Sequence, residues 1–126
     1  MARTRKGVVS IKFVHGSLEV SGSLVVAAPG LIVHRSYDFF TADPIKPVRW
    51  NVSHVASGLA VLGAGVFDNY PLKAQALHAA EALAGVTDWE QTDYSRAERL
   101  QMENDIIFVL SELQREAWEN GTQPTS

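Results

Sequence analysis

The residues best suited to acid–base chemistry or to metal binding are four histidines, at positions 15, 34, 54 and 78. They form no HxH or HxxxH pair and no His/Asp pair at the spacing typical of metal ligands. Ser53, His54 and Asp68 would supply the groups of a catalytic triad, but no Gly-x-Ser-x-Gly turn accompanies them. The sequence therefore favours a hydrogen-bonded sheet histidine at position 54, and we expect no enzymatic activity, no metal site and no cofactor.

Length and composition indicate one globular domain. The chain has 126 residues, 46% of them apolar and 20% charged, which is enough to bury about two-thirds of the surface of the unfolded chain. No apolar run approaches the roughly 20 residues that a membrane-spanning helix needs. Residues 1–6 are basic, but the alternating residues after them do not resemble a secretion signal. Since the chain also lacks cysteine, we expect a cytoplasmic protein without a membrane partner.

Charge is distributed unevenly along the chain. Residues 1–50 carry seven Lys or Arg and three Asp or Glu, a net charge of +4, whereas residues 51–126 carry four and eleven, a net charge of −7. The isoelectric point of about 5.7 lies well below the value of about 9 that nucleic-acid-binding domains usually exceed. DNA binding is therefore an alternative hypothesis. Its candidate phosphate contacts are Arg3, Arg5, Lys6, Lys12, Arg35 and Arg49.

Alternating apolar and polar residues predict a sheet in the first half of the chain. The alternation covers residues 9–13 and 18–24, with a turn at 15–16, and Gly22 suggests a bulge or a close backbone approach. Further strands are expected at 31–35, 48–54 and 59–62, the last two joined by a turn at 56–58. Two prolines and three aromatic residues indicate an ordered loop over 36–47. The pattern predicts a mostly antiparallel sheet of about five strands.

Two helices are expected after the sheet, packed on one of its faces. The first runs from about residue 70 to Gly85, a typical residue after a helix end, and its many alanines allow close approach to a sheet. The second runs from about 95 to 119, with Asp93 or Ser95 as its cap. These elements predict an α+β domain over 7–120, with a basic flexible arm at 1–6 and a disordered tail at 121–126.

Two apolar segments carry more large side chains than one small core obviously needs. One lies in the loop before residue 48, and the other is an uninterrupted run in the second helix. Core packing is one explanation, and a protein interface is the other. The simplest such interface is a twofold dimer in which the second helices pair. The candidate interface residues are Tyr37, Phe39, Phe40, Ile106, Ile107, Phe108 and Val109.

Residues 50–89 carry a family resemblance. The block of Trp50, His54 and Ser57-Gly58-Leu59, followed by Phe67 and Asp88-Trp89, resembles small uncharacterised proteins of actinobacterial phages and mobile elements. The resemblance implies an accessory protein that binds one host or phage macromolecule. A looser likeness, to AP2-type and integrase-arm sheets, would place Arg49, Asn51 and Ser53 on a base-reading side. Those domains have several cations on that side, whereas this hairpin has one.

The sequence thus favours a non-enzymatic, phage-type accessory protein that binds a protein partner and modulates it. A DNA-binding protein that uses the sheet and the basic arm is the alternative. A homo-oligomeric structural or self-assembling protein is the third hypothesis.

Overall fold

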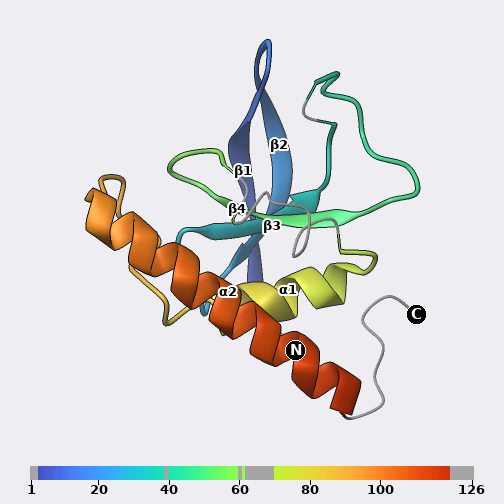
Figure 1. The fold of residues 1–126 in the computed structure, drawn as a ribbon. Helices are drawn as coiled ribbons and strands as arrows, with labels where there is room; N and C mark the ends of the chain where they lie inside the picture. The colour runs from blue at the N-terminus through green and yellow to red at the C-terminus, as the bar shows by residue number, and fades with distance from the viewer. Residues whose placement is uncertain (1–2, 39, 60, 62–69, 120–126) are drawn as a thin grey trace.

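The computed structural model describes residues 3–38, 40–59, 61 and 70–119, with the side chains of 117–119 left out. Within these residues, an antiparallel sheet of four strands precedes two C-terminal helices (Figure 1). The α+β class predicted from the sequence is therefore confirmed. The elements are β1 (Thr4–Phe13), β2 (Gly16–Val25), β3 (Leu31–Arg35), β4 (Trp50–His54), α1 (Lys73–Ala82) and α2 (Arg96–Glu119).

The sheet has the order β1-β2-β3-β4, so that each strand pairs with its neighbours in sequence. The fifth strand predicted at 59–62 is wrong for the described part of that segment. Leu59 accepts a hydrogen bond from the His54 amide, and the Val61 amide donates to Val52. The chain thus stays beside β4, but a turn at Gly58, with φ at 72°, prevents a regular strand from starting there.

The β1–β2 hairpin does not continue flat into the rest of the sheet. Gly7 and Gly22 face each other in the hairpin, and a Cβ atom on Gly22 would lie 2.6 Å from the Val33 carbonyl oxygen. Because no side chain separates Gly22 from β3, the hairpin bends there, and β2 pairs with β3 only at Ser23 and Leu24. The expected close backbone approach at Gly22 is confirmed, and the hairpin stands away from β3 and β4 (Figure 1).

The bend divides the apolar residues between two cores, one on each face of β3. On the helix side, Leu31, Val33 and Val52 pack with the alanines of α1, as the alanine-rich stripe predicted. On the other face, Val9 and Val20 of the curled hairpin enclose Ile32. Alternate residues of β3 therefore serve different cores, and four of its five residues are buried.

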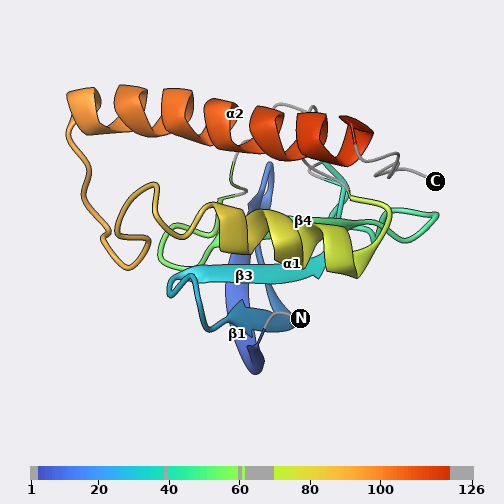
Figure 2. The ribbon, with the colours of Figure 1, turned by 90° about the horizontal axis from the view of Figure 1, so that it is seen from below.

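The two helices lie on the same side of the sheet but at different depths. Helix α1 contacts the sheet through Ala76, Ala79 and Ala80, which are fully buried. Helix α2 crosses outside α1 and reaches the helix-side core with Ile106 and Leu110 (Figure 2). Both helices thus lie on one side of the sheet, as predicted, and α1 lies between α2 and much of the sheet.

Local hydrogen bonds decide where each helix begins. Ser95 caps α2, since its hydroxyl accepts from the Glu98 amide at 3.1 Å while the Glu98 carboxylate accepts from the Ser95 amide at 3.1 Å. The predicted cap is confirmed. Helix α1 begins at Lys73, three residues later than predicted, because the backbone of Tyr70 pairs with that of Trp50.

The prediction of a flexible arm at residues 1–6 is wrong for the part of that segment that the structure describes. Strand β1 begins at Thr4, and its first residues pair with Ser23, Leu24 and Val25. The Arg3 carbonyl also accepts a hydrogen bond from the Val26 amide at 3.0 Å. The predicted tail at 121–126 lies outside the described residues.

Within the described chain, neither helix combines the length and apolar character needed to cross a membrane.

Replacement of Gly22 by alanine tests whether the fold depends on this close approach. The new methyl group would meet the backbone of β3, so we expect Gly22→Ala to destabilise the fold by about 2 kcal/mol. Gly85→Ala is the matched control, because a Cβ atom at Gly85 meets nothing within 4 Å. Urea denaturation of both variants checks the difference, and equal stabilities would contradict the role given to Gly22.

Candidate functional site

His54 is a hydrogen-bonded residue of the sheet, as expected. Its Nδ1 lies 2.9 Å from the Ser57 hydroxyl oxygen and its Nε2 lies 2.7 Å from the Trp89 carbonyl oxygen. The carbonyl can only accept, so Nε2 carries a proton and Nδ1 accepts from Ser57. Asp68, the third residue type of the hypothetical triad, lies outside the described residues. His54 therefore links the end of β4 to the loop around Trp89.

A second histidine pairs with a serine hydroxyl, which the sequence did not indicate. The Nε2 atom of His34 lies 2.7 Å from the Ser53 hydroxyl oxygen, and its Nδ1 lies 2.6 Å from the Arg35 carbonyl oxygen. Nδ1 therefore holds the proton and Ser53 donates to Nε2, which is the geometry of a nucleophile and its base. However, His34 and Ser53 are only 3% and 1% exposed. The pair thus satisfies buried polar groups and is closed to a substrate in this arrangement.

Burial also sets the ionisation of His34. Loss of hydration lowers the pKa of its imidazole below 6.5, and the hydrogen bond to the Arg35 carbonyl offsets this only in part. The neutral ring is the form that accepts from Ser53. Across the described residues, no three His, Asp or Glu side chains gather closely enough to hold a metal ion.

The six candidate phosphate contacts do not gather on one surface. Arg5 pairs with Leu24, which pairs with Ile32 near the start of β3. Arg35 follows Ile32 by three residues, or about 10 Å along the strand, and Arg49 leads into β4 beside it. Lys6 and Lys12 occupy the alternate positions of β1 and point to the opposite face from Arg5. Arg5 thus lies near one end of the strands and Arg35 and Arg49 lie near the other end, while Lys6 and Lys12 lie on the opposite face from Arg5.

The aromatic loop contributes one packed residue and one exposed residue. Tyr37 contacts Phe13 edge to face, with ring centroids 6.5 Å apart, and packs against the second core. Phe40 is 71% exposed, and Phe39 lies outside the described residues. The Asp38 carboxylate accepts hydrogen bonds from the Thr41 and Phe40 amides, which lower its pKa and order the turn.

The apolar run of α2 is divided between the core and solvent. Ile106 is 5% exposed and Val109 packs against the same core. Ile106 is therefore a core residue, and its prediction as an interface residue is wrong. Ile107 and Phe108 remain 47% and 57% exposed. Leu100, 55% exposed, extends this face although the sequence analysis missed it. The seven-residue interval between Leu100 and Ile107 was the available signal, because it equals two helical turns.

The exposed face of α2 carries no charge over four turns. Its residues recur at intervals of three and four, and each of them is exposed. Acidic residues at 98, 105 and 112 form a separate row beside this face. We call the uncharged face the outer strip, and its residues are Ala97, Leu100, Gln101, Asn104, Ile107, Phe108 and Ser111.

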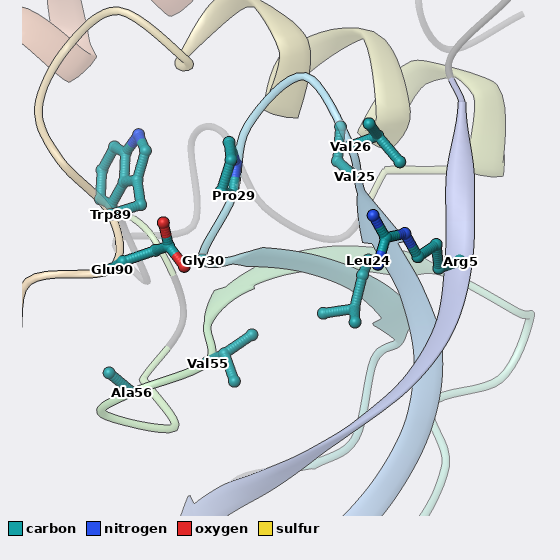
Figure 3. A pocket seen from close by; sticks show the side chains of 10 residues that line it. All are labelled: Arg5, Leu24, Val25, Val26, Pro29, Gly30, Val55, Ala56, Trp89 and Glu90. Atoms are coloured by element: carbon teal, nitrogen blue, oxygen red, sulfur yellow. The ribbon is translucent and has the colours of Figure 1, made fainter.

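A pocket of about 470 Å³ lies between β1, β2 and the loops around Pro29 and Trp89 (Figure 3). Its walls are mainly apolar, with Leu24 from β2 and with Val55, Pro29 and Trp89 from turns and loops. Arg5 and Glu90 supply its charged groups and lie at opposite ends (Figure 3). Neither side chain forms an ion pair with another described residue. No local sequence pattern indicates this pocket, since its residues come from five separate segments.

Comparison with known protein families, with curated proteins and with solved structures finds no match.

The buried imidazole of His34 predicts a loss of stability in mild acid. Its pKa is lower in the folded than in the unfolded chain, so protonation below about pH 6.5 favours the unfolded state. Stability should fall from about pH 7 to about pH 5, and His34→Gln should reduce this slope. His15→Gln, at the exposed hairpin turn, is the control. Urea unfolding at each pH measures the slope, while a nuclear magnetic resonance titration that places the wild-type His34 pKa above 6.5 would refute the prediction.

Proposed function

We propose that this chain is a non-enzymatic binding protein that occupies a protein partner through α2 and that, without the partner, it forms a homodimer paired through the same helix. The outer strip of α2 carries the proposal. It places Leu100, Ile107 and Phe108 in solvent, each about half exposed, on a helix whose other face is already packed on α1. A contiguous uncharged face bordered by acidic residues is typical of an interface core with a polar rim.

The spacing within the strip favours a helix as the opposing surface. Leu100 and Ile107 fall at one heptad position, and the small or polar residues Ala97, Asn104 and Ser111 fall at the other. Small residues let two helix backbones approach closely, and an asparagine at such a seam favours one register. Helix α2 has 24 residues, or about 36 Å, and can supply a complete seam to a second copy.

The area available sets the strength of this pairing. Burying the exposed halves of three apolar side chains stabilises association by about 1 kcal/mol each, or about 6 kcal/mol for two copies. Association costs about 4–15 kcal/mol in lost freedom of motion. A weak, concentration-dependent dimer follows, which leaves the strip able to exchange a second copy for a partner helix. We further propose, from the resemblance expected over residues 50–89, that the partner is a host or phage protein.

A charge placed in the strip tests the pairing. We expect the wild-type chain at about 100 µM to exceed the monomer mass by light scattering, and Ile107→Glu to return it to the monomer. Ser17→Glu adds the same charge at an exposed position on β2 and should leave the mass unchanged. A wild-type monomer mass across the whole concentration range would refute the dimer.

The partner is tested by affinity purification from a bacterial host. A tagged wild-type chain should retain one protein in stoichiometric amount, Ile107→Glu should lose it, and Ser17→Glu should keep it. Repeated purifications that yield only background proteins, or a partner that Ile107→Glu retains fully, would contradict binding through the strip.

A further inference from the structure

The curled sheet is closed along only part of its edge. Strand β1 is the outermost strand, and it meets the turn after β4 where the Lys12 amide donates to the Gly58 carbonyl at 3.4 Å. A Cβ atom on Gly58 would collide with the Ser10 carbonyl oxygen, which confirms how closely the two segments approach. From Thr4 to Val8, no such bond from the described part of the chain reaches the outer edge of β1.

The pairing of β1 shows which backbone groups are free along this edge. The Lys12 amide points away from β2, and β1 pairs with β2 residue for residue without a bulge. Because the direction of backbone groups alternates along an antiparallel strand, Thr4, Lys6 and Val8 also point their N–H and C=O groups outward. An extended segment of about five residues could pair with them.

The pocket lies beside this free edge. Arg5 enters it from β1, and Val55 and Ala56 line it from the segment that leads to Gly58 (Figure 3). Leu24, the β2 residue opposite Arg5, gives the pocket an apolar floor. A strand added to β1 would therefore send alternate side chains into the pocket, where they meet first Arg5 and then the apolar wall.

Charge determines which segment fits the edge. Arg3, Arg5 and Lys6 are exposed, and β1 contains no acidic residue. Two copies of β1 placed side by side would bring these cations against one another, which is destabilising. A segment that carries a carboxylate would instead meet Arg5, a cation without a partner among the described residues. The edge thus selects an acidic segment over a second copy of itself.

We propose that the free edge of β1 from Thr4 to Val8 binds an extended acidic peptide segment of a partner protein by β-strand addition. The peptide places a carboxylate side chain at Arg5 and an apolar side chain, two residues along, against Leu24 and Val55. Backbone hydrogen bonds to β1 supply affinity, and the pocket supplies selection. This site lies on the sheet, away from the outer strip of α2, and so adds a second binding surface to the one proposed above.

Fluorescence anisotropy with a labelled peptide tests the site. The probe is the capped peptide Thr-Val-Asp-Val-Leu-Val-Thr, which we expect to bind the wild-type chain with a Kd below about 100 µM. Arg5→Glu should weaken binding at least about tenfold. The same charge reversal at an exposed cation of the far strand end, Arg35→Glu, should leave binding unchanged. Ile107→Glu should also bind normally, which separates this site from the outer strip.

Two further peptides distinguish strand addition from simple charge attraction. Lysine in place of the aspartate removes the partner of Arg5, and proline in place of the central valine removes a backbone donor. Both should bind at least about tenfold more weakly, and the amides of Thr4, Lys6 and Val8 should exchange more slowly when the aspartate peptide is bound. Equal binding of the proline peptide, full displacement by inorganic phosphate or duplex DNA, or no binding at about 1 mM would each overturn the proposal.

Discussion

The contact of Gly22 with the backbone of β3 is the constraint on which the remaining structure depends. A side chain at this position would meet the Val33 carbonyl oxygen and hold the hairpin away from β3. Without one, the hairpin bends and folds its inner residues over Ile32. The same bend carries Ser10 and Lys12 to Gly58 and leaves the earlier part of β1 beside the pocket. The missing side chain at Gly22 therefore shapes the second core, and together with the one missing at Gly58 it shapes the open edge.

Buried polar side chains then fix how the loops lie against this sheet. His54 holds the Trp89 carbonyl, and the Trp89 indole donates to the Leu83 carbonyl at 2.8 Å. The Trp89 carbonyl also lies directly over Gly30, where any larger residue would collide with it. Trp89 thus joins the end of β4, the end of α1 and the turn before β3. One wall of the pocket is consequently held by hydrogen bonds as well as by apolar packing.

Local sequence patterns predicted most helices and strands. They did not predict the contacts between segments that are distant in the sequence. The Ser95–Glu98 capping box and the alanine stripe of α1 each come from residue spacing within one helix, so that spacing alone is informative. The His34–Ser53 bond depends on strand register, which no local pattern states. The run from Ile106 to Val109 shows a similar limit, because consecutive apolar residues do not reveal which side of α2 is covered. The pocket could not be predicted because it exists only after the sheet has curled.

The order of the strands also bears on how the chain reaches this structure. Each strand pairs with the strand before it in the sequence, so no two paired residues of the sheet are more than 23 positions apart along the chain. Low contact order of this kind shortens the search for native pairings and favours rapid folding. During synthesis, the complete sheet can form as soon as His54 leaves the ribosome. Its helix-facing core then stays open until α1 emerges, which makes the docking of that alanine face a late event in folding.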